Sequence, residues 1–237
     1  MNLKNKIAVV TGASDGIGKE VCLKLAKEGV SLALIARDEG RLNEVKNKCI
    51  ELGSPKVEGY ICDISDNEKV KEAVNKILVD FNGVNILLNI AGVWQKLNLL
   101  ENIPDEEIDS VIDIDLKGMI YVTKLFLKHF KEKADEESII LNISSRSGVT
   151  AQEGQNIYTA AKWGVTGFSE SLKADLKGSK IKVATVYQGG TNTELFNKTG
   201  EHFNQDKFIN PSDLADTIVF MLSRPSQIWL HDVRVEY

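Results

Sequence analysis

Short apolar runs of strand length alternate with longer segments of helical period along the whole chain of 237 residues. The strand candidates are residues 7–11, 31–36, 57–62, 84–89, 138–143, 182–186 and 228–235. The helical patterns lie between them, near residues 16–28, 39–52, 68–81, 106–131, 158–176 and 211–222. Two of the candidates contain segments that are apolar on both faces, residues 86–88 (ILL) and 139–141 (IIL), which is typical of central strands in a parallel sheet covered by helices on both faces. The alternation predicts one α/β domain over residues 1–237, with a doubly wound parallel sheet of seven strands.

Composition and charge narrow the class of protein. Lys and Arg number 29 against 34 acidic residues, and the formal net charge of −5 disfavours nucleic acid or an anionic membrane as the main partner. No segment has the length of a transmembrane helix, and the N-terminus lacks the apolar stretch of a signal peptide, so we expect a cytoplasmic protein. Cys22, Cys49 and Cys62 are widely spaced, which predicts neither a disulfide framework nor a metal site.

A glycine-rich loop follows the first strand. Residues 11–18 read TGASDGIG and lead directly into a helical pattern. Glycines in such a turn let the backbone approach a pyrophosphate, and the helix N-terminus offers unpaired N–H groups to it. A loop of this kind can also serve packing alone, but its position favours a dinucleotide. The expected cofactor contacts in this loop are Gly12, Ser14, Asp15, Gly16, Ile17 and Gly18.

The end of the second strand bears on the choice of cofactor. NAD sites place an acidic residue there for the ribose hydroxyls, whereas a 2′-phosphate requires a cation. Ala36 occupies the acidic place and Arg37 follows it, which favours NADP over NAD. Asp15 and Asp38 lie in the same neighbourhood and would weaken the attraction for a phosphate. Arg37 could instead be a solvated residue that begins a loop.

Three further residues suggest acid–base chemistry. Tyr158 and Lys162 are four residues apart at the start of a helical pattern, so their side chains share one face. An ammonium group near a phenol stabilises the phenolate and lowers its pKa from about 10 toward the working range. Ser145 follows the fifth strand and could donate a hydrogen bond to a carbonyl oxygen that gains negative charge. Taken one at a time, these residues also have non-catalytic interpretations: the Tyr/Lys pair could be exposed to solvent, and the serine could begin a turn at the end of the strand.

Together, the glycine loop, the segment 89–92 (NIAG), Ser145 and the Tyr158/Lys162 pair resemble the short-chain dehydrogenase/reductase family over nearly the whole chain. The resemblance implies a Rossmann-type sheet of order 3-2-1-4-5-6-7 and a Ser–Tyr–Lys catalytic set. It also implies that Lys162 holds the nicotinamide ribose and that the protein forms a homodimer or homotetramer. The cofactor contacts implied beyond the glycine loop are Asp63, Ile64, Asn89, Ala91, Gly92, Gly189, Thr191 and Thr193.

The sequence departs from the family pattern at two places. The Asn that usually precedes L-x-G in the long fourth helix is Asp115 here, and an ionised Asp115 would partly neutralise the influence of Lys162 on Tyr158. The usual Pro-Gly after the sixth strand reads Gln188-Gly189, which removes a fixed φ and adds an N–H donor.

We therefore predict an oxidoreductase that transfers a hydride between NADP(H) and a small carbonyl or secondary alcohol. Residues 192–210, the longest stretch without periodicity, are expected to form a loop over the substrate. The alternative is a non-catalytic NADP(H)-binding sensor or scaffold of the same fold. Nothing in the sequence selects a substrate among ketoacyl thioesters, sugars, hydroxy amino acids and other ketones. Trp94 could line the substrate pocket or pack in the core.

Overall fold

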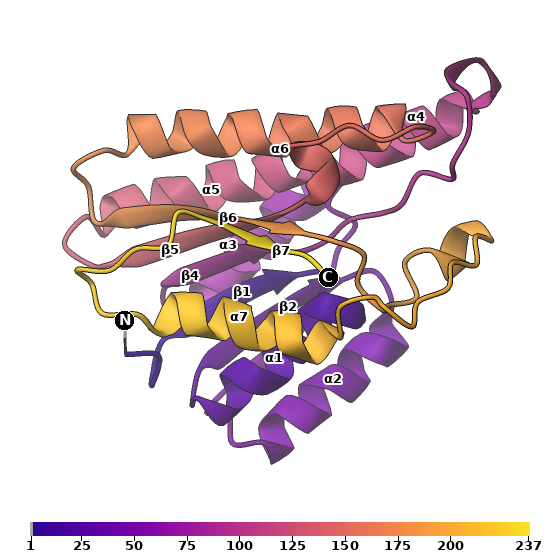
Figure 1. Cartoon of the computed structure of the whole chain (residues 1–237). Helices are drawn as coiled ribbons and strands as arrows, with labels where there is room; N and C mark the ends of the chain where they lie inside the picture. Colours follow the sequence, from indigo (N-terminus) through magenta and orange to yellow (C-terminus); the bar gives the residue numbers. More distant parts are fainter. Residues whose placement is uncertain (1) are drawn as a thin grey trace.

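The computed structural model describes residues 2–237 as one parallel sheet of seven strands with helices on both faces (Figure 1). The strand order is β3-β2-β1-β4-β5-β6-β7, which confirms the order implied by the family resemblance. The strands are β1 (Ile7–Thr11), β2 (Ser31–Ala36), β3 (Val57–Ile61), β4 (Ile86–Asn89), β5 (Ser138–Ser145), β6 (Ile181–Gln188) and β7 (Asp232–Val235). The α-helices are α1 (Gly16–Lys27), α2 (Glu39–Glu51), α3 (Asn67–Phe81), α4 (Asp105–Ile112), α5 (Met119–Glu132), α6 (Asn156–Asp175) and α7 (Pro211–Ser223).

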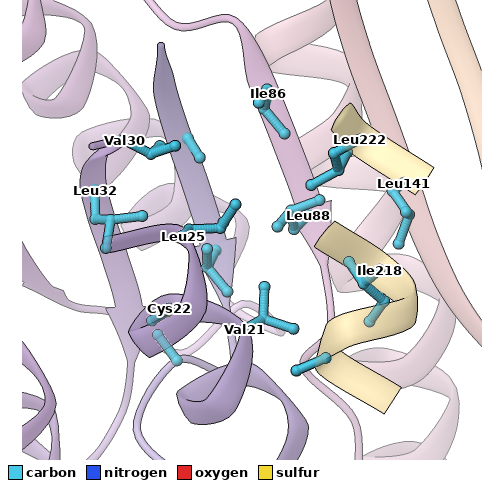
Figure 2. Packing of buried hydrophobic residues seen from close by; sticks show 14 of the residues in the cluster. Val21, Cys22, Leu25, Val30, Leu32, Ile86, Leu88, Leu141, Ile218 and Leu222 are labelled. Carbon is cyan, nitrogen blue, oxygen red and sulfur yellow. The ribbon is translucent and has the colours of Figure 1, made fainter. Parts of the chain in front are cut away.

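Two apolar clusters hold the layers together. On one face, α1 and α7 pack side by side against the central strands, and Figure 2 shows Val21 and Leu25 of α1 opposite Ile218 and Leu222 of α7. On the other face, α3, α5 and α6 cover the sheet, with the fully buried ring of Phe126 among the largest side chains. Because both faces are covered, β4 is buried at all four positions, which explains why its first three residues are all apolar.

The sheet has its topological switch point at β1. This strand pairs with β2 on one side and β4 on the other, so the chain winds in opposite directions from it. Open α/β sheets bind ligands in the crevice at the carboxyl ends of the strands at such a point. The loop 192–210 follows β6 at this end of the sheet (Figure 1).

The structure corrects several predicted boundaries. Strands β5 and β6 each run two residues beyond the predicted ends, because Ser145 stays in register with Gln188 although both are polar. The last strand is shorter than predicted, since residues 228–231 precede β7. The predicted helix 106–131 is divided into α4 and α5 by a π-helical segment, Asp113–Gly118. The loop 192–210 contains one short 3-10 turn, Asn197–Thr199.

Within residues 2–237, no helix is long and apolar enough to cross a membrane. All three cysteines are buried free thiols. No group of three or more His, Cys, Asp or Glu side chains in this part of the chain is arranged to hold a metal ion.

Candidate active site

The glycine loop packs tightly against the segment after β4. Gly12 has a φ of +69°, and a Cβ atom there would lie 2.8 Å from the Cα of Ala91, so a larger residue cannot be accommodated. A Cβ at Gly18 would collide with the carbonyl oxygen of Gly12. Thr11 fixes the arrangement, because its Oγ1 accepts hydrogen bonds from the N–H groups of Ile90 (3.0 Å) and Ala91 (3.1 Å). The loop therefore brings bare backbone to the start of α1, which is what a bound pyrophosphate requires.

Asp15 caps α1 at this place. Its Oδ1 accepts from the N–H of Gly16 at 2.7 Å, and its Oδ2 pairs with Lys198 at 2.9 Å and Arg41 at 3.3 Å. Burial raises the pKa of Asp15, but Lys198, Gly16 and Arg41 together outweigh burial and hold it below its usual value. The carboxylate is therefore ionised, and two cations offset the repulsion that it would exert on a phosphate.

A cavity of about 350 Å³, the glycine-loop cavity, opens beside this turn. Arg37 lies in it with Nη1 3.6 Å from Asp63 Oδ2, which places the end of β2 next to the end of β3. Fifteen of the residues predicted from the sequence line this cavity: Gly12, Ser14, Asp15, Gly16, Ile17, Gly18, Arg37, Asp63, Ile64, Ala91, Gly92, Asp115, Tyr158, Lys162 and Thr193. Its lining thus combines the glycine turn with Arg37 and Arg41, and these residues fit a dinucleotide cofactor.

Three other predicted cofactor contacts lie elsewhere. Asn89 is buried below the cavity, where its Nδ2 donates to Asn142 Oδ1 (2.8 Å) and Thr123 Oγ1 (2.9 Å). Gly189 and Thr191 line a second cavity of about 280 Å³, described below. The side chain of Asn89 therefore supports the carboxyl ends of β4 and β5 in this structure.

Tyr158 and Lys162 lie one turn apart on α6, both buried, with Lys162 Nζ 5.4 Å from the centroid of the Tyr158 ring. Ser145 ends β5, and its Oγ accepts from the N–H of Ser147 at 3.1 Å, which leaves the hydroxyl hydrogen to donate elsewhere. Gln95 is fully buried, and its Oε1 accepts from the N–H of Tyr158 at 2.8 Å. The structure thus brings the three predicted catalytic side chains to one edge of the sheet, with the first turn of α6 fixed by a hydrogen bond from outside the helix.

Asp115 lies in the π-helical segment and forms a buried ion pair with Lys162. Its Oδ2 is 2.9 Å from Lys162 Nζ, and its Oδ1 accepts from the N–H of Val93 at 2.7 Å. The extra residue of a π-turn is frequently found at functional sites. Here that segment directs a carboxylate at the lysine beside the tyrosine.

Each of these buried groups has a shifted pKa. The pKa of Tyr158 lies above its usual value, because burial and Asp115 raise it more than Lys162 and Ser145 lower it. The lowering expected from the sequence is therefore outweighed in this structure by burial of the phenol. Burial alone would lower the pKa of Lys162, but Asp115 and Tyr158 outweigh it and raise this pKa, so the ammonium stays charged. Burial also raises the pKa of Asp115 against the opposing effects of Lys162 and the Val93 N–H.

The second cavity, here the aromatic cavity, adjoins the catalytic side chains. Tyr158, Ile17, Gln188, Thr193 and Leu195 line both cavities, so the two meet at the tyrosine. The rings of Trp94, Phe196, Phe203, Phe208 and Tyr237 form one wall of the aromatic cavity, and Ser145, Arg146, Gln152, Gln155 and Asn204 contribute polar groups.

Trp94 and the loop 192–210 close part of this cavity. The Trp94 ring lies 4.7 Å from Tyr158 and 5.0 Å from Phe196 between ring centroids. Glu201 of the loop accepts hydrogen bonds from Trp94 Nε1 and, at 2.8 Å, from the N–H of Leu97. The sequence left open whether Trp94 packs in the core or lines a pocket. In the structure it does both, because its side chain is buried and lines the aromatic cavity beside Tyr158.

Comparison with known proteins identifies the family. Residues 6–204 match the family model described as short chain dehydrogenase. The chain belongs to this family. An uncharacterized oxidoreductase of Staphylococcus saprophyticus is 31% identical over 235 residues, which cover 99% of this chain and 98% of that protein.

Two solved structures of short-chain dehydrogenases or reductases resemble this chain closely. A metagenomic short-chain oxidoreductase in complex with NADP has a TM-score of 0.86 at 27% identity, covering 100% of this chain and 98% of that one. A 3-ketoacyl-(acyl-carrier-protein) reductase from Brucella melitensis complexed with NADH has a TM-score of 0.87 at 28% identity, covering 99% and 98%. The chain is therefore an oxidoreductase of the short-chain dehydrogenase family whose relatives bind nicotinamide cofactors.

Several residues of this short-chain dehydrogenase site were not predicted from its sequence. Arg41 could have been found, because it lies in the first turn of α2, four residues after Arg37. Lys198 and Glu201 lie in a loop without periodicity and meet partners 183 and 104 to 107 residues away, so no local signal marks them. Gln95 follows Trp94 in a coil segment and likewise carries no pattern.

Proposed function

We propose that this protein is an NADP(H)-dependent oxidoreductase that interconverts a carbonyl group and a secondary alcohol. The observation that carries the proposal is the position of Tyr158. Its side chain lies where the glycine-loop cavity meets the aromatic cavity, between the expected places of cofactor and substrate. Lys162 lies one turn further along α6, and Ser145 opens on the same cavity from the end of β5.

The chain's own residues support NADP over NAD. Arg37 and Arg41 both line the glycine-loop cavity, and no acidic residue occupies the last position of β2, which is Ala36. Guanidinium groups bind a phosphate in two-pronged geometry, whereas a ribose hydroxyl would favour a carboxylate there. One similar structure holds NADP and another holds NADH, so cofactor preference in this chain depends on these side chains.

The proposed mechanism assigns one task to each residue. When bound, the nicotinamide supplies a hydride to the carbonyl carbon, and the protein provides position and charge. Tyr158 donates its phenolic proton to the carbonyl oxygen, and the Lys162 ammonium stabilises the phenolate that remains. Ser145 donates a hydrogen bond to the same oxygen, since its own lone pair already accepts from Ser147 N–H.

Lys162 also lies at the glycine-loop cavity, where its ammonium would hold the nicotinamide ribose. Asp115 positions that ammonium and keeps it charged, and the Val93 N–H in turn fixes the carboxylate. In the oxidative direction the same groups act in reverse, so Tyr158 must be ionised to accept the proton of the alcohol.

We also propose that the loop 192–210 covers the substrate and that the protein assembles as a homodimer or homotetramer. Phe196, Phe203 and Phe208 of the loop line the aromatic cavity, which supports the first point. Trp163 on α6 is 50% exposed, which supports a helix-paired interface. Light scattering of the purified protein would measure the oligomer.

The test of the proposed function is a screen in which ketones, aldehydes and acyl thioesters are offered with NADPH. The oxidation of NADPH is measured by the loss of its absorbance. We expect turnover of at least one carbonyl class, and tighter binding of NADPH than NADH. Binding of NADPH without turnover of any of these classes would refute the proposed carbonyl–alcohol interconversion and favour a cofactor-binding sensor or scaffold.

A further inference from the structure

Arg146 stands out among the residues of the aromatic cavity. It directly follows Ser145 and begins the short 3-10 turn Arg146–Gly148. Among the residues that line this cavity within residues 2–237, it carries the one charged side chain. A single cation therefore lies in a largely aromatic and amide-lined space, next to a side chain of the catalytic set.

The partner of this guanidinium is a neutral amide. With the Gln152 amide oriented to satisfy its neighbours, its oxygen accepts from Arg146 Nε at 2.8 Å and from Nη2 at 2.9 Å. No carboxylate of residues 2–237 lies within ion-pair distance of Arg146. The cations of the glycine-loop cavity differ, because Arg37, Arg41 and Lys198 each pair with an aspartate.

An unpaired charge in a partly buried cavity is costly unless a counter-charge binds there. Arg146 is partly buried, and its remaining N–H donors have no partner in the described chain. Guanidinium groups are suited to carboxylates, which they bind through two parallel hydrogen bonds. The missing counter-charge in this cavity can be supplied by the molecule that enters it.

We propose that the substrate carries a carboxylate that binds Arg146, and that it is therefore a short oxo acid or the corresponding hydroxy acid. The inference rests on the proposed function and specifies its substrate class. Ser145 and Arg146 line the same cavity of about 280 Å³, so one small molecule bound there can present a carbonyl to Ser145 and a carboxylate to Arg146. The aromatic wall then packs against the apolar part of the molecule.

The charge of the cavity favours a carboxylate over a phosphate. One positive side chain balances one negative charge, whereas a phosphate monoester carries nearly two at neutral pH. Gln152, Gln155 and Asn204, which also contribute polar groups to the aromatic cavity, are neutral. A substrate with a neutral ester or thioester in place of the carboxylate would leave Arg146 without a counter-charge.

The test compares each oxo acid with its own methyl ester. Acetoacetate, 4-oxopentanoate and 5-oxohexanoate would be assayed with NADPH beside their methyl esters. Dihydroxyacetone phosphate would be assayed in the same way, to compare a phosphate with the carboxylates. We expect kcat/KM to favour at least one acid over its ester by tenfold or more, mainly through KM. Arg146→Ala should lower that acid-to-ester ratio at least tenfold, and Arg146→Lys should lower it less.

A second variant keeps the test decisive if Arg146→Ala folds poorly. Gln152→Glu introduces a carboxylate where the amide oxygen contacts Arg146, so it should lower the acid-to-ester ratio while Arg146 stays in place. Arg234→Ala is the matched control, because Arg234 is exposed on β7 and lines neither cavity; its ratio should stay within twofold of wild type.

The outcomes separate this inference from the proposed function. Turnover of esters as fast as acids by the wild type, or preference for the phosphate, would overturn the carboxylate site and leave the oxidoreductase intact. An unchanged acid-to-ester ratio in both Arg146→Ala and Gln152→Glu would also overturn it. Absence of turnover with every carbonyl compound, including the neutral ketones, would refute the proposed function itself.

Discussion

Asp115→Asn removes one negative charge from beside Lys162 and leaves a side chain of almost the same shape. The Asn oxygen can still accept from the N–H of Val93, so the π-helical segment keeps its link to the loop after β4. The change therefore acts chiefly on the electrostatics of Tyr158. We expect the variant to fold and to retain kcat/KM within about tenfold of wild type.

The structure gives the scale of the effect. Asp115 Oδ2 is 2.9 Å from Lys162 Nζ, which lies 5.4 Å from the centroid of the Tyr158 ring. The carboxylate is thus no more than about 8 Å from the ring, and at an effective dielectric constant of about 20 two unit charges interact there by about 2 kcal/mol. That energy corresponds to about 1.5 pH units in the midpoint of a titration.

The assay is the oxidative reaction, with kcat/KM for an alcohol and NADP⁺ measured from pH 6 to 11. Oxidation needs the Tyr158 phenolate, so the rate rises with pH through the pKa of this tyrosine. The Asp115 carboxylate opposes the phenolate and raises that pKa. Its removal should therefore move the midpoint of the profile to lower pH, by about one pH unit or more.

Asp113→Asn is the matched control. Asp113 begins the same π-helical segment, but it pairs at the surface with Lys117 at 2.7 Å, and its replacement should leave the profile unchanged. An unshifted profile in Asp115→Asn would mean that Asp115 is protonated in the working enzyme. A collapse of activity would mean that the carboxylate itself takes part in the reaction. Either result would refute the electrostatic account of this position.

Three further predictions concern the cofactor and the fold. Arg37→Ala should weaken NADPH binding by about 1–3 kcal/mol and leave NADH binding almost unchanged, as titration calorimetry would measure; equal wild-type affinity for both cofactors would contradict it. Lys162→Ala should impair both cofactor affinity and kcat, because its ammonium has two partners; a loss of only one would contradict the dual role. Burial and Lys133 lower the pKa of His129, whose Nε2 accepts from Val84 N–H at 3.1 Å. Its contribution to stability is therefore complete above about pH 6.5 and lost on acidification, so wild type should lose more stability than His129→Gln between pH 7 and 5 in urea titrations.

The sheet could be predicted from the sequence because its central strands are buried on both faces. A run such as β4, apolar at three of four positions, has few other places in a folded chain. The polar ends of β5 and β6 could not be predicted, because Ser145 and Gln188 are held in the sheet by their pairing with each other. The π-helical turn at Asp113–Gly118 keeps helical periodicity on either side, so the sequence reads as one continuous helix.

In the active site, too, local features could be predicted from the sequence, whereas contacts between distant segments could not. That Tyr158 and Lys162 share one face of a helix could be predicted, because helix geometry fixes their spacing locally. The ion pair of Lys162 with Asp115 depends on the packing of α6 against another helical segment, and no spacing along the chain encodes it. Arg146 lacks a carboxylate partner because of which side chains surround it in the folded cavity, and no spacing along the chain indicates that.

The central claim is that Tyr158 is the proton donor in a reaction supported by a bound nicotinamide cofactor. Tyr158→Phe removes the hydroxyl and keeps the ring that contacts Trp94 at 4.7 Å between centroids. The decisive measurement is single-turnover oxidation of NADPH by the variant with a carbonyl substrate of the wild type, beside NADPH affinity by fluorescence. The account predicts unchanged affinity and a rate lower by about 10²–10⁴-fold, the usual contribution of a general acid. A Tyr158→Phe enzyme that turns over within a fewfold of wild type would contradict it.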